Sequence, residues 1–450
     1  MLPSFDLITR YSTLNIIVQI SSYSGEPDLT QKPNKSIFVV LDRFLELKVT
    51  SNITSPIHRG SLTYIDRAGE LIDFIGDDNV FITITVNRWA DMHGPDSASP
   101  VFDSGVGFNH IFVVDKFEIL EHNLQQDTIK IDFTSINYFL LLQNCVYATS
   151  QQLDAITILN GIFGSALPNS ELILPTNYSS STSKKMSYIS TINSSLMDSI
   201  EYIINYGFDP NDGPIFLTHD ISAGNFILWM QKYWDNDDLH DPSQVSQSVR
   251  YTAYIPSRQK YTQMEQLFCD EITLKNLVTT TSIYNKTKDF TEKTFDFTTG
   301  TFIPTPYSQN AIINLLSKKQ TNSLYLPKIR TWLPKGIGLK TNASFATTRT
   351  IANYEELLSS KIKSVLLDNN VLAIKTNGWP LRTPGDPFLL IGNTAFSMRM
   401  SVNMLVGRWT VAQVNHIFRP NEYKNELVLV RNEKIADKNM IEYLDVIGGE

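Results

Sequence analysis

The chain has 450 residues, of which 42% are hydrophobic and 19% charged, a balance that is typical of folded domains and excludes a largely disordered chain. Its formal net charge is −8 and like charges are scattered, which excludes the basic stripe of a sequence-independent nucleic-acid binder. It has no apolar stretch long enough to span a bilayer and no secretory signal, so we expect no membrane anchor, and we expect Cys145 and Cys269 to be buried and unpaired.

Residues 1–135 read as short β-strands separated by turn-forming residues. Apolar and polar side chains alternate along residues 80–86 and 127–133, which is the period of a half-buried strand. Further strands are predicted at residues 16–20, 37–41, 61–66 and 111–117. Several short strands with turns between them indicate a β-barrel or sandwich. Residues 87–107, rich in Pro, Gly and Ser, are expected to form an extended surface loop.

Residues 136–240 change to a mixed pattern, which predicts a small α+β domain. A first helix is expected from apolar residues at helical spacing, with Gly164 placed to end it: Leu153, Ile156, Leu159 and Phe163. Ser195 and Asp198 resemble a capping box that opens a second helix, ended by Gly207. A small hairpin is predicted at residues 215–217 and 226–230.

The remaining chain is predicted to be β-rich. Residues 241–345 form a connecting region, in which the Thr- and Lys-rich stretch 279–301 indicates exposed strands. Residues 346–435 combine a helix at 353–366, strands at 371–376 and 388–391, and a tight turn at 382–386. Residues 436–450 are a C-terminal tail.

Residues 407–432 carry the most informative alternation and predict a β-hairpin around a turn at residues 419–422. On simple alternation the first strand places one set of residues on one face: Trp409, Val411, Gln413, Asn415 and Ile417. The second set falls on the other face: Thr410, Ala412, Val414, His416 and Phe418. The returning strand places Leu427 and Leu429 together.

The run G-x-W-x-V … V-x-H-x-F … Y-x-x-x-L-x-L-x-R in this hairpin resembles the baseplate hub proteins of contractile-tailed phages and the hub part of type VI secretion spikes. The stretch 212–229 and the turn at 382–386 also resemble that family. The resemblance is specific over residues 365–432 and weaker at 1–135 and 200–230, while 88–107 and 280–300 have no counterpart. It implies a mainly β fold with α+β insertions, namely two tail-tube-like β-barrel domains (1–135 and 346–435) and a small α+β domain.

The family implies a homotrimer without cofactor or metal. Three chains with two barrels each would form a pseudo-six-fold ring that joins a three-fold central spike protein to a six-fold tail tube protein and lets DNA pass. Baseplate wedge proteins and the tape measure protein are further implied partners, in a virion tail baseplate assembled in the host cytoplasm. The acidic balance of the chain suggests the hypothesis that a negative lumen does not trap DNA.

The residues that matter in this interpretation are structural. Gly407 permits the turn into the hairpin, and Trp409 and Val411 fill the core. The closing strands are held by a further set: His416, Phe418, Tyr423, Leu427, Leu429 and Arg431. A weak repeat relates residues 112–133 to 409–431, and it reflects either two ordinary hairpins or two copies of one barrel.

A search for chemistry finds no catalytic residue, so the chain is predicted not to be an enzyme. The seven histidines lack zinc-site spacing, and the acidic stretch 235–241 fails the calcium-loop pattern at Leu239. No G-x-S-x-G elbow is present. Two alternatives stay open: a receptor- or carbohydrate-binding module of a tail, and a cell-wall hydrolase with an unrecognised site.

Overall fold

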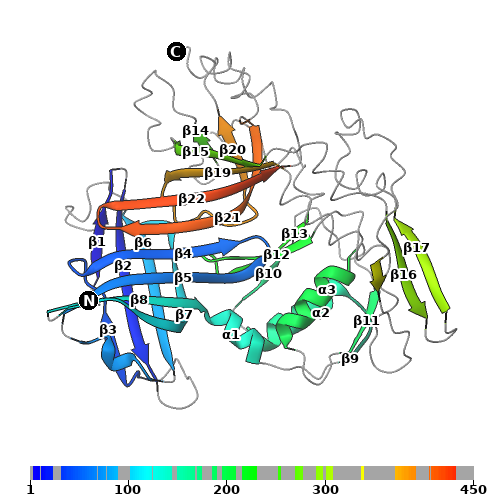
Figure 1. The fold of residues 1–450 in the computed structure, drawn as a ribbon, viewed down its shortest axis with the longest axis horizontal. Coiled ribbons are helices and arrows are strands. Elements are labelled where there is room, and N and C mark those ends of the chain that lie inside the picture. The colour runs from blue at the N-terminus through cyan, green and yellow to red at the C-terminus, as the bar shows by residue number, and fades with distance from the viewer. Residues whose placement is uncertain are drawn as a thin grey trace, which may run out of the picture.

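The computed structural model describes two stretches of the chain (Figure 1). The first is residues 4–230 apart from 11, 24–31, 68, 78, 90–101, 124, 144–148, 168–169, 175–184, 190–194 and 209–214. The second comprises residues 252–254, 269–276, 290–296, 301–307, 336–338, 370–391, 405 and 407–431. The predicted helix at 353–366 and Cys145 lie outside these residues.

One sheet of fourteen strands organises the molecule. Eleven of them follow one path: β1 (Phe5–Ile8), β2 (Thr13–Ser22), β6 (Val80–Trp89), β7 (Phe102–His122), β8 (Asp127–Ser135), β5 (Ser55–Asp66), β4 (Phe44–Asn52), β21 (Gly407–Arg419), β22 (Glu422–Arg431), β19 (Asn370–Asn377) and β15 (Cys269–Asn276). Off this path, β3 (Lys35–Phe38) pairs with β2, β20 (Pro387–Ile391) with β21, and β14 (Thr252–Tyr254) with β20.

Eight neighbouring strands, β7-β8-β5-β4-β21-β22-β19-β15, are antiparallel at every joint, and we call them the eight-strand layer. The N-terminal and C-terminal strands meet where β4 pairs with β21, from Asn52 opposite Gln413 to Leu47 opposite Phe418. Figure 1 shows this joint as blue strands beside orange ones. The strands of the two predicted barrel regions are therefore edge to edge in one sheet.

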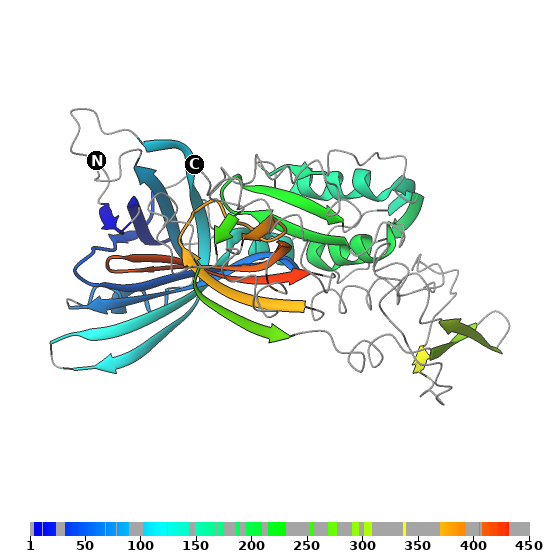
Figure 2. The ribbon, with the colours of Figure 1, turned by 90° about the horizontal axis from the view of Figure 1, so that it is seen from above.

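The core lies between this layer and the strands that curl over it (Figure 2). Alternation along β2, β6, β4, β5 and β8 sends one side chain in two to the same interior, which joins Ile16, Ile84, Val49, Leu62 and Ile131 in one cluster. The large sheet bends along β7. The first half of β7 pairs with β6 and its second half pairs with β8, with a register shift between Val114 and Lys116. The predicted mainly β fold is confirmed.

A smaller α+β unit packs beside the sheet. It contains α1 (Ile136–Gln143), α2 (Ala155–Ala166), α3 (Leu196–Tyr206) and the strands β10 (Leu172–Ile173), β12 (Ile215–Asp220) and β13 (Asn225–Met230), with a separate pair β9 (Thr149–Asp154) and β11 (Lys185–Ile189). The capping box of Ser195 and Asp198 is confirmed. Gly164 was wrongly predicted to end α2, which continues to Ala166, where the Leu167 N–H still donates to the Phe163 carbonyl at 2.8 Å. The hairpin of β12 and β13 is confirmed.

Two further predictions are settled in part. The loop at 87–107 is shorter than expected, because β6 extends to Trp89 and β7 begins at Phe102, where the two rings stack at 4.1 Å. Within the Thr-rich region, β16 (Phe290–Asp296) pairs with β17 (Thr301–Tyr307) and β18 (Gly336–Gly338).

The domain borders stay a prediction. Among the described residues no helix is long and apolar enough to cross a membrane.

Candidate functional site

One face of the eight-strand layer carries mostly polar and charged side chains, with apolar exceptions at Ile417, Val428 and Val371, and we call it the polar face. Cross-strand partners share a face, so the registers carry this face across every joint, including the one between β4 and β21. Among the described residues, its charged side chains are eight cations and nine anions. The cations are Lys48, Arg59, Lys116, Lys130, Lys275, Lys375, Arg419 and Lys424, and the anions are Glu46, Asp115, Glu118, Glu121, Asp132, Asp270, Glu271, Glu422 and Glu426.

Ion pairs recur along the polar face. Lys116 Nζ lies 3.2 Å from Glu118, and Lys130 Nζ lies 2.9 Å from Asp132. The remaining pairs join Arg419 to Glu46 at 2.6 Å, Lys375 to Glu426 at 3.7 Å, and Lys424 to Asp270. The neighbouring carboxylates raise the pKa of Lys130 and of Arg419, because each stabilises the charged form.

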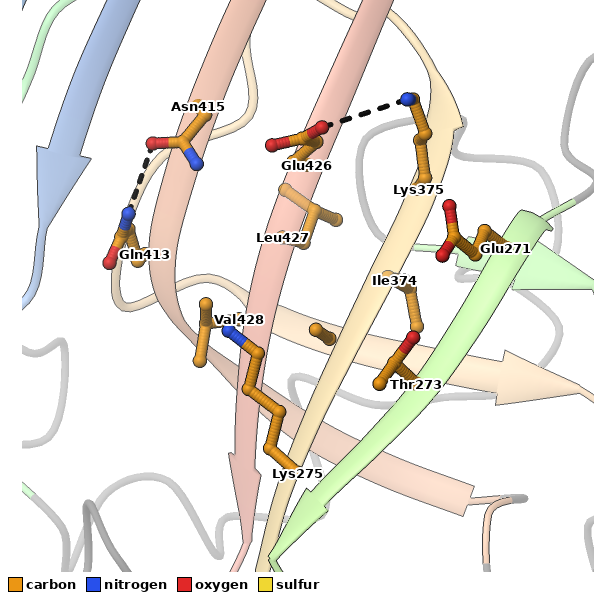
Figure 3. A pocket seen from close by; sticks show the side chains of 11 residues that line it. Glu271, Thr273, Lys275, Ile374, Lys375, Gln413, Asn415, Glu426, Leu427 and Val428 are labelled. Atoms are coloured by element: carbon orange, nitrogen blue, oxygen red, sulfur yellow. Dashed lines mark hydrogen bonds and ion pairs between the residues drawn. The ribbon is translucent and has the colours of Figure 1, made fainter.

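A shallow hollow of about 210 Å³ opens on this face over β15, β19, β22 and β21 (Figure 3). Ala373 is a small residue in its lining, which also contains Lys275 and Lys375. Gln413 donates to Asn415 at 3.0 Å, and the Lys375–Glu426 pair lies beside them. In the described part of the chain, no cluster of three or more His, Cys, Asp or Glu side chains is arranged to hold a metal ion. The hollow combines short polar side chains with balanced charge.

The hairpin of β21 and β22 forms as predicted, with one correction. Ala412 is an extra residue between Val411, which faces Leu429, and Gln413, which faces Val428. This bulge shifts the alternation, so Trp409 and Val411 lie on the same face as Val414, His416 and Phe418 rather than with Gln413 and Asn415. The alternation of apolar and polar residues in the sequence does not reveal such a bulge.

The predicted hairpin residues lie together in the interior. Trp409 is 3% exposed, its Nε1 donates to the Leu405 carbonyl at 2.8 Å, and the Arg431 guanidinium lies 4.1 Å from its ring centre. Gly407 opens β21 with φ of 118°, which favours glycine. The others are buried on the core face: Val411, His416, Phe418, Tyr423, Leu427 and Leu429.

His416 belongs to a buried polar network. Its Nδ1 lies 2.8 Å from Tyr423 Oη and 3.0 Å from Asn425 Nδ2, and its Nε2 lies 3.2 Å from the Arg382 carbonyl. Asn425 Oδ1 accepts in turn from Arg382 Nη1 at 3.1 Å. Burial lowers the pKa of His416 to about 4, so the ring is neutral near pH 7 with Nε2–H as the donor.

The turn at residues 382–386 joins this hairpin to the α+β unit. Gly385 donates its N–H to the Val411 carbonyl at 2.8 Å and has φ of 91°. A Cβ at this position would lie 1.9 Å from Trp229 Nε1 on β13. Thr383 Oγ1 donates to the His219 carbonyl on β12 at 3.4 Å. The turn is therefore in contact with three elements that are distant in sequence.

A second buried histidine group lies behind the layer and was missed by sequence reasoning. His219 Nδ1 and His58 Nε2 are 2.6 Å apart, and His58 Nδ1 is 2.6 Å from Ser51 Oγ. Asn137 on α1 reaches His219 Nε2 at 3.3 Å. One set of tautomers satisfies all three contacts, with Asn137, His219 and His58 each donating to the next. No sequence signal links His58 and His219, because 161 positions separate them.

The two ends of the eight-strand layer have open edges among the described residues. β15 pairs with β19 alone, and residues 114–122 of β7 have β8 on one side and no described strand on the other. Core-face residues inside the layer are covered, for example Ile129 and Leu372 at 0% exposure. Their cross-strand partners at the edges, Ile119 and Leu274, are 48% and 43% exposed. Among the described strands, neither edge has a neighbour that would cover it.

No family model matches the sequence, and no curated protein matches it. Among solved structures, the tail protein from Neisseria meningitidis MC58 has a TM-score of 0.49 and 9% identity, over 93% of this chain and 98% of that chain. The 43 kDa tail protein of prophage MuSo2 from Shewanella oneidensis has a TM-score of 0.44 and 8% identity, over 92% and 98%. A chain of the half-lidded Francisella PdpA-VgrG complex has a TM-score of 0.49 and 13% identity, over 95% of this chain and 60% of that chain. At these scores and identities the similarity carries no argument about function.

Proposed function

We propose that this chain is a structural hub of a phage tail baseplate or a related contractile injection system, and that three copies join their eight-strand layers into a closed ring. The observation that carries the proposal is the continuity of this layer, to which the N-terminal and C-terminal regions each contribute strands. The hairpin residues that resemble the hub family lie at the joint within it. The role is structural and needs no turnover.

Strand direction supports closure between copies. The layer has an even number of strands and every joint is antiparallel, so β7 and β15 run in opposite directions. β15 of one copy can therefore pair with β7 of the next in the antiparallel manner used everywhere else. Such pairing would cover Ile119 and Leu274 and would remove two exposed strand edges, which soluble proteins otherwise protect.

The implied partners follow from this ring. A three-fold spike protein would sit on one side and a six-fold tail tube protein on the other, with wedge proteins outside and DNA or a tape measure protein in the lumen. The polar face would line that lumen, because the opposite face is occupied by the apolar core.

Solution mass tests the ring. We expect 153 kDa, three times 51.0 kDa, by sedimentation at high protein concentration. Changing Ile119→Glu and Leu274→Glu places a charge at each open edge and should return the protein to 51.0 kDa. The matched control is Ile8→Glu, at a residue of edge strand β1 that is 60% exposed and outside the layer. A single-copy mass under all conditions, or equal dissociation by the control, would contradict the proposal.

A further inference from the structure

The charged side chains of the polar face form ion pairs that packing of the core does not require. Its charged side chains are 19% to 60% exposed in the ion pairs, so they are not required to fill the interior. The overall charge of −8 is not concentrated there, since eight cations and nine anions lie on the described part of this face. The hypothesis of a negative lumen therefore does not describe this face.

We infer that the polar face is built to let a double-stranded polyanion move along it without being held, because five of its eight described cations are paired with a carboxylate that cancels their field. This rests on the proposed function, in which the face lines a channel. The pairs involve every strand of the layer except β5, from Lys116–Glu118 on β7 to Lys375–Glu426 on β19 and β22. They cover both the N-terminal and the C-terminal half.

The cancellation follows from the spacing of the charges. Cross-strand neighbours on one face lie about 5 Å apart. The Debye length at physiological ionic strength is about 8 Å. A phosphate approaching the wall therefore senses both members of a pair at once, and the net potential is small. Polyanion binding depends on cations that release counterions from phosphates, and a cation already neutralised by a carboxylate contributes little of this.

The geometry also opposes specific capture. A phosphate-binding site needs several donors that converge without a competing anion, as at a guanidinium fork or a helix N-terminus. Here Arg419 is engaged by Glu46 at 2.6 Å and Glu422 at 3.5 Å. Lys130 is engaged by Asp132 at 2.9 Å. Removing the carboxylates should therefore change the polar face from a surface that does not retain DNA into one that binds it.

The test removes three face carboxylates while leaving their lysines: Glu118→Gln, Asp132→Asn and Glu426→Gln. We expect this face variant to bind a short mixed-sequence double-stranded DNA at low salt about tenfold or more tightly than the unchanged chain, with loss of binding as salt rises. The matched control is Asp42→Asn, Glu70→Gln and Asp77→Asn, which also breaks three ion pairs with the same charge change but lies outside the polar face. The control should bind no more tightly than the unchanged chain.

A second variant tests whether the lysines left unpaired in the face variant cause the DNA binding. Adding Lys116→Gln, Lys130→Gln and Lys375→Gln to the face variant should return DNA binding to its starting level. Melting curves check that all variants fold, since exposed ion pairs contribute little to stability. The inference is overturned if the unchanged chain already binds as tightly as the face variant, or if the control gains as much.

The same samples separate this inference from the proposed ring. Sedimentation without DNA reports the mass of each variant independently of its DNA binding. A trimer that fails the DNA test rejects the charge-pairing inference alone. A single-copy chain that passes it rejects the ring, while the electrostatic property of the face stands.

Discussion

Among the described residues, Arg382 is the largest fully buried side chain, at 1% exposure. Burial lowers its pKa to about 10, which still leaves it charged at neutral pH. Its Nη1 donates to Thr376 Oγ1, to the Asn377 carbonyl at 2.9 Å and to Asn425 Oδ1 at 3.1 Å. A buried cation with this many acceptors ties the 382–386 turn to the hairpin, and leaving those acceptors unpaired would be costly.

Trp409 is the first residue-scale prediction. Trp409→Ala removes a ring that is 3% exposed, its contact with Arg431 and its hydrogen bond to Leu405. We expect a loss of about 3–5 kcal/mol in the free energy of unfolding, measured by denaturant titration. Ile8→Ala, at a position that is 60% exposed, is the control and should change little. A Trp409 variant that melts like the unchanged chain would show that the ring does not support the core.

The buried histidines predict how stability depends on pH. Burial lowers the pKa of His219 and of His416 to about 4 and that of His110 to about 3, while an unfolded histidine titrates near its ordinary value of 6.5. Between those values the unfolded chain binds more protons than the folded one, so stability falls as pH decreases from 6.5 toward 4. Each such group adds a slope of up to about 1.4 kcal/mol per pH unit.

His416→Gln tests this slope. Denaturant unfolding at several pH values between 4 and 7 should show a smaller dependence on pH in the variant, because one of the depressed groups is gone. Its absolute stability should fall too, since Tyr423 Oη and Asn425 Nδ2 lose a partner. An unchanged slope would mean that His416 is not buried in neutral form.

At the scale of elements, the turn at 382–386 explains why the hairpin and the α+β unit hold one position. Gly385 combines a positive φ with close contact to Trp229. The bulge at Ala412 places Trp409 on the core side, and the Ala412 carbonyl accepts from the Ile53 N–H at 2.8 Å beside the end of β4. A small cluster of Ile53, Ala412, Phe216 and Val430 closes this corner.

Gly385→Ala is the element-scale prediction. The added Cβ would meet Trp229 Nε1, so Trp229 must move, and overpacking of this kind costs about 1–3 kcal/mol beyond the backbone strain. Gly69→Ala is the matched control, because Gly69 has φ of 72° but no atom within 4 Å of the new Cβ. Thermal melts of both variants separate the two costs. Equal destabilisation would show that the contact with Trp229 is unimportant.

At the scale of the whole molecule, the joint between β4 and β21 makes distant regions one unit. Phe418 and Tyr423, from the C-terminal hairpin, belong to the same core cluster as the N-terminal strands. Their rings stack at 4.3 Å. The two regions are therefore expected to unfold together rather than as separate domains.

Native-state hydrogen exchange measures this coupling. The amides of β4 and β21 that bond across the joint should open with the same free energy and the same dependence on denaturant. Amides of the β9–β11 pair, which lies outside the large sheet, provide the comparison and should open more easily. Protection of β4 that survives the opening of β21 would contradict a single cooperative unit.

The local sequence pattern determined much of the secondary structure of this protein. Alternation predicted β2, β5, β6, β8, β19 and the β21–β22 hairpin, and the capping box predicted α3, because these signals arise from neighbours along the chain. It missed β4, although Leu47 and Val49 alternate with polar residues there, and it missed α1 directly after β8. The resemblance of residues 407–431 to hub proteins likewise depended on short-range spacing.

Tertiary structure alone decided the features that depend on contacts between distant segments. Examples are the joint of β4 with β21, the phase shift at Ala412, and the meeting of His58 with His219. The balanced polar face is of the same kind, because strands from four regions of the chain contribute to it. Periodicity states which side chains share a face of one strand, but the register between strands is set by packing over the whole core.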